Sequence, residues 1–312
     1  MAAYLIRRLW QMIPTLIGVV LLVFFLFKYF GGDPAEILGG QNATPEQIEA
    51  IRAQLGLDRP VIEQLWIFVK QILSFDWGRS WATSESVSHI FATRLPATLT
   101  VMVPILLLEV LLAIPFALAV AYVRGSLTDR AIMVLTTVAL SISFLVYVIA
   151  GQYVFAFRLG WFPVQGWTDS FWTNLTVYSV LPVLLATMVS LAPQTRLYRS
   201  FFLDEIGQDY VRTARAKGLA ERTILLKHVL RNALIPILTN IAVGLPSIFV
   251  GSFLIEVFFS IPGIGREVLL AVNRSDYPVI QAVTIYLAVL TMVINLLTDV
   301  LYKLVDPRVV LK

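Results

Sequence analysis

Residue types that support catalysis or metal binding are scarce in this chain. It has no cysteine and only two histidines, His89 and His228, which excludes thiol chemistry and disfavours a multi-histidine metal site. No G-x-x-x-x-G-K-[ST], H-E-x-x-H or G-x-S-x-G motif occurs, so the usual signatures of a P-loop, a zinc protease and a serine hydrolase are missing. We therefore expect no enzyme, no ATPase site and no cofactor or metal in this chain.

One ionisable residue, Glu109, interrupts the otherwise uncharged stretch 95–123. A charge deep in a bilayer is costly, so such a residue usually faces a cavity or a partner group. Glu109 is therefore a candidate contact on a solute or proton pathway. The alternative is a buried carboxyl group that is hydrogen-bonded to an adjacent helix or subunit, and the sequence leaves both open.

A second concentration of polar residues lies between residues 198 and 236. One helical stripe carries Leu203, Ile206, Tyr210 and Ala214. Gly218 is expected to end this helix, a second short helix follows, and Pro236 is expected to open the next apolar stretch. The pattern predicts a compact helix–glycine–helix unit that is too polar to enter a membrane. It is either an ordinary basic loop or a docking surface for a partner protein.

The composition indicates the environment of these residues. The 312 residues are 58% hydrophobic and only 14% charged, with a mean hydropathy of +0.80, whereas soluble domains are about a quarter charged. A spanning helix needs about 20 mostly apolar residues. Six stretches qualify: 9–27, 95–123, 131–157, 170–195, 232–255 and 277–298. We predict an all-α polytopic membrane protein with six transmembrane helices.

The distribution of basic residues predicts the orientation. With the N-terminus inside, 15 Lys and Arg residues fall on the cytoplasmic side and 9 on the outer side, as the positive-inside rule requires. Both termini are therefore expected in the cytoplasm. We expect the first stretch to be a retained span, because it is long for a signal peptide and no A-x-A-like cleavage site follows it.

Residues 31–94 form a large outer loop with helical signals of its own. Thr44, Pro45 and Gln47 predict a capping box with proline at the first helical position, and Gly56 predicts the end of that helix. A second helix is expected from Pro60. Its apolar stripe comprises Ile62, Leu65, Trp66, Val69, Ile72 and Leu73. This stripe is expected at the membrane surface or against the outer ends of the spans, with a partner-protein surface as the alternative.

Several motifs resemble those of one family. Asp209, Tyr210, Val211, Arg212, Thr213, Ala214, Arg215, Ala216, Lys217, Gly218 and Leu219, together with residues 231–236, resemble the cytoplasmic signature loop of ABC importer permeases. Arg212-Thr213-Ala214 stands where the general signature has Glu-Ala-Ala, which is similar to the dipeptide/oligopeptide branch. Residues 5–15, 32–34, 55–58, 256–266, 276–279 and 295–308 also resemble that branch, so the resemblance covers essentially the whole chain.

The resemblance implies a type I ABC importer permease, the first of two permeases in its system. It implies an N-terminal helix (1–30), an extracytoplasmic helical loop (31–94), a five-helix core (95–304) with a coupling loop (198–236), and a cytoplasmic tail (305–312). Residues 209, 210 and 212–219 would couple the chain to ATPases. Its location would be the bacterial inner membrane.

The partners that the resemblance implies are a second homologous permease, two cytoplasmic ATP-binding subunits that bind ATP and Mg²⁺, and an extracytoplasmic binding protein. The solute would be a di- or oligopeptide. Related importers of nickel, glutathione or antimicrobial peptides are alternatives. An alternative from another class is a proton-coupled secondary transporter that uses Glu109, although the inner loop would then have no explanation.

Overall fold

The computed structural model describes residues 2–40 and 43–305, so residues 306–312 of the expected tail lie outside the described part. Contacts divide the chain into two compact units, residues 1–96 with 264–312 and residues 97–263. The boundary falls inside helix α5 (Val87–Tyr122). Among the described residues, β-type pairing is limited to an isolated bridge between Arg79 and Ser86. The all-α prediction is therefore confirmed.

The expected spans correspond to long apolar helices. Within the described residues, five helical stretches are long and apolar enough to cross a membrane: Ile6–Phe30, Val87–Tyr122, Val180–Ile206, Glu221–Phe258 and Tyr277–Val300. A sixth span results if the bent pair Leu127–Ser141 and Phe144–Arg158 is counted as one. The prediction of six spans is confirmed on that count.

The prediction of one uninterrupted helix over 131–157 is wrong. Helix α6 (Leu127–Ser141) stops, and α7 (Phe144–Gly151), which continues as the π-helical η1 (Gln152–Arg158), leaves at 88°. The hydroxyl of Tyr147 donates to the carbonyl oxygen of Ala139 at 3.0 Å. The same carbonyl also accepts from the N–H of Ile142 at 3.4 Å, so the bond from Tyr147 adds a contact that stabilises the bend.

Two other boundaries also differ from the sequence expectation. A short helix α8 (Phe171–Thr173) and the π-helical η2 (Asn174–Tyr178) precede α9 (Val180–Ile206), which runs past the expected end at residue 195. Its extension carries Arg199, whose guanidinium forms two bonds of 2.9 and 2.8 Å with the buried Asp129 of α6. Helix α12 (Leu230–Val250) runs through Pro236 instead of beginning there.

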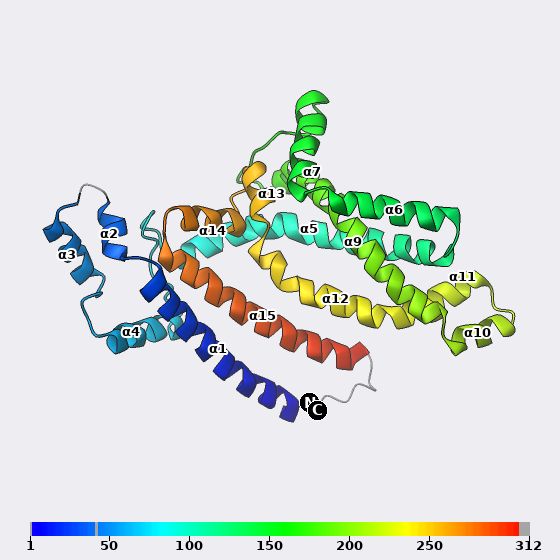
Figure 1. Ribbon diagram of the computed structural model, residues 1–312, viewed down its shortest axis with the longest axis horizontal. Helices are drawn as coiled ribbons and strands as arrows, with labels where there is room; N and C mark the ends of the chain where they lie inside the picture. Colours follow the sequence, from blue (N-terminus) through cyan, green and yellow to red (C-terminus); the bar gives the residue numbers. More distant parts are fainter. Residues whose placement is uncertain (1, 41–42, 306–312) are drawn as a thin grey trace. The chain divides into compact units, whose positions relative to one another are not determined.

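In the unit formed by 1–96 and 264–312, α1 (Ala2–Phe30) packs along α15 (Tyr277–Val305), as Figure 1 shows. The short helix α14 (Ile264–Asn273) precedes α15. Residues 31–94, which the sequence predicts outside and which keep the name outer loop below, contain α2 (Pro34–Gly39), α3 (Pro45–Gln54) and α4 (Val61–Leu73). The predicted capping box of Thr44 and Gln47 is confirmed, with both of its hydrogen bonds formed.

A buried aspartate fastens the outer loop of the same unit. The carboxylate of Asp276 accepts hydrogen bonds from the hydroxyl of Ser80 and from the backbone N–H groups of Trp81 and Ala82. The ring of the next residue, Tyr277, lies 5.5 Å from that of Trp81 and 5.2 Å from that of Phe27. Asp276 therefore holds the segment before α5 against the start of α15.

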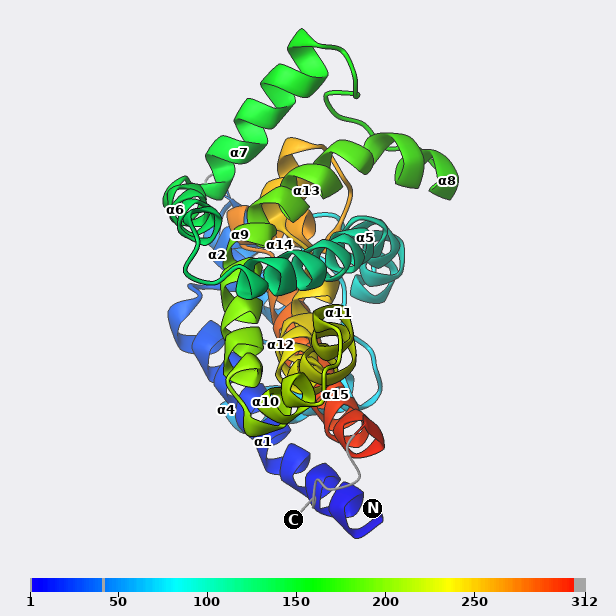
Figure 2. The same ribbon diagram turned by 90° about the vertical axis from the view of Figure 1, so that its right-hand side faces the viewer.

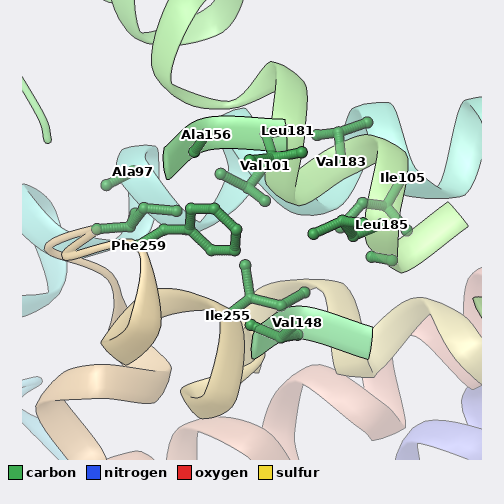
Figure 3. Close-up of a cluster of buried hydrophobic side chains, with 12 residues drawn as sticks. Ala97, Val101, Ile105, Val148, Ala156, Leu181, Val183, Leu185, Ile255 and Phe259 are labelled. Atoms are coloured by element: carbon green, nitrogen blue, oxygen red, sulfur yellow. The ribbon is translucent and has the colours of Figure 1, made fainter. Parts of the chain in front are cut away.

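In the unit formed by 97–263, apolar side chains converge from four elements. Figure 3 shows Phe259 and Ile255, from α13 (Phe253–Phe258) and the residue that follows it, directed towards Val101 of α5 and Leu185 of α9. Val148 of α7 joins the same cluster. Because buried apolar area stabilises at about 25 cal/mol per Å², this cluster is the main fastening of α13 to the spans.

Candidate functional site

The segment singled out in the sequence forms a separate short helix, α10 (Asp209–Ala216). The expected continuous stripe from Leu203 to Ala214 is interrupted, because α9 ends at Ile206 and Gly207 caps it. Figure 2 shows α10 at the end of α9, next to α11 (Glu221–Thr223). Asp209 in the first turn and Arg215 in the last turn complement the helix dipole.

The inner face of α10 is apolar and closely packed. Val211 is fully buried and Ala214 nearly so. They belong to one cluster with residues of α5, of α9, of the π-helical η3 (Ile224–Val229) and of α12. Its other fully buried members are Ala113, Ala117, Tyr198, Phe202, Ile224, Val229, Ala233 and Ile237. A movement of α10 must therefore be passed to α9 and α12, since close-packed interiors transmit strain.

The outer face of α10 is polar and exposed. The predicted site residues on it are Asp209, Arg212, Thr213, Arg215, Ala216, Lys217, Gly218 and Leu219. The guanidinium of Arg215 contacts Glu221, with Nε to Oε1 at 2.8 Å and Nη2 to Oε2 at 3.3 Å. Three cations and the apolar Leu219 side chain therefore share this surface. The predicted residues therefore divide among the exposed face of α10, its buried face, where Ala214 lies, and the turn of residues 217–219 that follows it.

Gly218 ends the helix in the way that the sequence predicts. Its φ is +75°, in the left-handed region that a residue without Cβ adopts at little cost. Its N–H donates to the carbonyl of Arg215 at 2.9 Å, and that of Leu219 donates to Ala214 at 3.3 Å, which is the Schellman pattern. A Cβ at position 218 would meet no atom within 4 Å. The glycine is therefore required by the backbone and not by neighbouring atoms.

Tyr210 lies between the two faces and has polar partners that the sequence did not indicate. Its hydroxyl donates to the carboxylate of Glu205, five residues earlier and across the break at Gly207. Burial raises the pKa of Tyr210, and Glu205 raises it further, while Asn232 acts in the opposite direction. Because Glu205 and Asn232 flank α10 on both sides, Tyr210 links the helix to the ends of α9 and α12.

The chain matches known proteins over nearly its entire length. Residues 113–311 match the family described as "Binding-protein-dependent transport system inner membrane component", and residues 1–102 match "Binding-prot-dependent transport system membrane comp, N-term". It is 35% identical over 311 residues to a putative peptide transport system permease protein of Brucella abortus (strain 2308), covering 99% of each chain. The same identity, over 309 residues and 99% of each chain, relates it to glutathione transport system permease protein GsiC of Salmonella choleraesuis (strain SC-B67).

The chain belongs to the binding-protein-dependent transport system inner membrane component family. It is therefore a permease of an ABC importer, as the signature loop indicated. The family also accounts for the shortage of catalytic residue types. Among the residues that the structure describes, no group of three or more His, Asp or Glu side chains is arranged to hold a metal ion.

In this permease, Glu109 lies on α5 and is half-buried. Its carboxylate interacts with Ser190 and Gln194, one helical turn apart on α9. The nearby hydroxyl of Tyr198 donates to Asn240 of α12 at 3.3 Å. Glu109 therefore has polar partners on the adjacent helix α9.

The permease also contains a buried carboxylate at Glu256, whose side chain is 1% exposed. The hydroxyl of Thr98 donates to its Oε1 at 2.9 Å. A Cβ at Gly251 would stand 2.1 Å from the same oxygen, and one at Gly263 would stand 2.4 Å from the carboxyl carbon. These two glycines create the space that the carboxylate occupies, which explains their presence on either side of α13.

Proposed function

We propose that this permease carries di- or oligopeptides. The support is the pair of relatives whose names specify peptide and glutathione transport, each 35% identical and aligned over 99% of this chain. Glutathione is itself a tripeptide, so both names describe short peptides. The solute is best identified with the extracytoplasmic binding protein, which can be loaded, captured with the complex and analysed for its ligand. Recovery of nickel in place of a peptide would overturn the proposed solute class.

We infer that the outer face of α10, residues 209–219, is the docking site for a cytoplasmic ATPase. The support is the two-sided character of the helix: Val211 and Ala214 attach it to the spans, while Arg212, Arg215 and Lys217 face outward. Shifting a two-state equilibrium from 1:99 to 99:1 requires about 5.5 kcal/mol of differential binding. A docking helix that transmits this energy has to be attached firmly, and the buried face of α10 provides the attachment.

The proposed assembly contains a second homologous permease, two ATP-binding subunits and an extracytoplasmic binding protein. The ATP-binding subunits would hold ATP and Mg²⁺. The proposed location is the bacterial inner membrane, with both termini in the cytoplasm and residues 31–94 outside. The support for this orientation is the distribution of Lys and Arg, 15 against 9. A cysteine introduced in the loop 31–94 should react with a membrane-impermeant thiol reagent in intact cells.

The substitution Gly218→Val tests the docking site. A β-branched residue at φ +75° is strongly disfavoured, so we expect the end of α10 to be remodelled. Transport and ligand-stimulated ATPase activity should be abolished, while the complex still inserts. Gly207→Val is the matched control, because Gly207 has φ −75° and the nearest atom to an added Cβ is 3.6 Å away. Full activity in Gly218→Val would contradict the docking role.

For Glu109 we propose that the carboxylate joins α5 to α9 beside the pathway. Glu109→Gln preserves the shape of the side chain but removes its charge, and it should measurably change transport or the yield of the assembled complex. Wild-type values for both would exclude a role. The competing proton-coupled mechanism predicts uptake that collapses with an uncoupler and survives ATP depletion, and the proposal here predicts the reverse.

A further inference from the structure

The unit formed by 1–96 and 264–312 contains a cavity of about 530 Å³, within the size range of small-ligand sites. It lies among the end of α1, the helices of the outer loop and the start of α15. Much of its wall is aromatic, with Phe24, Phe27, Phe68, Trp77, Trp81 and Tyr277 lining it. None of the functions described above uses this cavity.

One part of the cavity is polar and carries an excess of positive charge. Three cations and two carboxylates line it: Lys28, Arg52 and Arg79, with Asp33 and Asp76. Arg52 forms an ion pair with Asp33, and Lys28 also acts electrostatically on that carboxylate. The Nζ of Lys28 donates to Oε1 of Gln64 at 2.9 Å, which uses one of its three donors. Lys28 therefore keeps two further N–H donors for a ligand. It lies beside the ion pair of Arg52 and Asp33, in which the two charges cancel.

The cavity lies where the span of α1 ends and the span of α15 begins. Lys28 stands near the end of the apolar stretch Ile6–Phe30, and the other span of this unit starts at Tyr277, which also lines the cavity. These two spans pack along each other within the unit. The cavity is therefore at the depth of lipid headgroups, whichever side of the membrane it faces.

Beside the cavity, α4 presents apolar side chains that nothing in its unit covers. Ile62, Trp66 and Leu73 are 82%, 67% and 72% exposed, while Glu63 and Lys70 lie on the adjoining polar side of the helix. The opposite edge of the helix packs on α1, where the rings of Phe68 and Phe24 are 5.8 Å apart. An amphipathic helix of this kind is typical of a membrane interface.

The exposed stripe of α4 continues the exposed apolar surface of the span α1. The outer half of α1 exposes Leu22, Phe25, Leu26 and Phe30, and α1 is one of the spans. Because α4 packs directly on this half of α1, lipid that covers α1 also reaches α4. This continuity identifies lipid as the occupant of the stripe.

We propose that this cavity binds the phosphate headgroup of an anionic phospholipid, with Lys28 as its main contact and with α4 lying in the membrane interface. An ammonium group forms charge-assisted hydrogen bonds with phosphate oxygens. The aromatic wall and the stripe of α4 accommodate the glycerol and the first part of the acyl chains. The inference depends on membrane insertion of the permease and not on its solute or on ATPase docking.

Native mass spectrometry of the purified complex tests the proposal. The complex is titrated with phosphatidylglycerol or with phosphatidylcholine of the same chains. We expect preferential binding of phosphatidylglycerol, reduced about five-fold by Lys28→Gln, because one basic residue contributes about 1 kcal/mol near an anionic surface. Lys70→Gln is the matched control: it removes the same charge from the exposed side of α4, outside the cavity, and should weaken binding clearly less than Lys28→Gln does. Equal binding of both lipids, or an equal loss in both variants, would overturn the proposal.

Two further arms separate the possible sources of the phosphate. Inorganic phosphate and glycerophosphoglycerol carry the headgroup chemistry without acyl chains, and neither should displace the lipid at comparable concentration. Displacement by either would assign the cavity to a free phosphate compound, and displacement by a short acidic peptide would assign it to a peptide.

If Lys28→Gln fails to assemble, Trp66→Ser replaces it, since this side chain is 67% exposed and its loss should leave folding intact. It should weaken retention of phosphatidylglycerol, and unchanged retention would contradict the proposal.

Discussion

The α10 region and the outer helical loop are fastened in opposite ways. Around α10, apolar side chains such as Val211 lie inside and cations lie outside. In the outer loop, polar contacts join the segments: the buried Asp276 holds residues 80–82, and the partly exposed Arg52 pairs with Asp33. Several of its large apolar residues, Ile62, Trp66, Leu73 and Phe75, are exposed.

The difference follows from the solvent that each region meets. Burial of apolar groups is favourable when the alternative is water, as for a helix that stands in an aqueous compartment. Next to a bilayer the alternative is lipid, which is as apolar as a leucine side chain, so apolar packing gains little. Directional hydrogen bonds to a buried carboxylate still stabilise there. The outer loop therefore depends on polar anchors, and α10 depends on its apolar core.

The largest effect is expected from Val211→Asp, which places a carboxylate in the dry cluster beneath α10. An unpaired buried charge costs more than about 3 kcal/mol, so α10 should detach and ligand-stimulated ATPase activity should disappear. Thermal unfolding of the purified complex measures the loss. Arg212→Asp introduces the same side chain one residue later on the exposed face and should leave the melting temperature unchanged. Equal melting temperatures for the two variants would contradict an apolar attachment.

The corresponding change in the outer loop, Asp276→Ala, should be smaller and local. It leaves the hydroxyl of Ser80 and the N–H of Trp81 without their acceptor, which costs about 2–3 kcal/mol. Amide hydrogen exchange should accelerate at residues 80–82 and stay as in the wild type in α10. Asp58→Ala, at an exposed position in the same loop, serves as the control. Exchange that accelerates equally in α10 would mean that the two regions are not fastened independently.

The contrast between local and distant contacts also explains what the sequence could predict. The capping box at Thr44, the start of α4 after Pro60 and the end of α10 at Gly218 depend on residues within a few positions, and all three predictions are confirmed. The burial of Glu256 depends on Thr98, 158 residues away. The bend after α6 likewise depends on Tyr147 reaching back to α6. A single sequence has no local signal for such pairings.

Lowering the pH should also destabilise the outer loop, but by less than the substitutions described above. Burial of Asp33 opposes ionisation, but the bond from Arg52 and the charges of Arg52 and Lys28 lower its pKa below 3.8. Because the folded-state pKa is depressed, the stabilisation is complete well above pH 3.8 and is lost as the pH falls through the lower folded value. Protection of α2 should fall less than about five-fold, given the exposure of the pair. Arg52→Gln should remove this pH dependence, and the apolar contacts of Val211 beneath α10 should contribute none.

The smallest effect on stability is expected at the exposed pair of Arg215 and Glu221, because such pairs contribute less than about 1 kcal/mol. Arg215→Gln and Glu221→Gln should each shift the unfolding free energy by less than about 0.5 kcal/mol. Their effects on ligand-stimulated ATPase activity should differ, however. If Arg215 contacts the ATPase, only Arg215→Gln should lower the ATPase activity. If the Arg215–Glu221 pair only stabilises the turn after Gly218, both variants should lose the same activity. A large drop in melting temperature for either variant would show that the outer face of α10 also holds the helix in place.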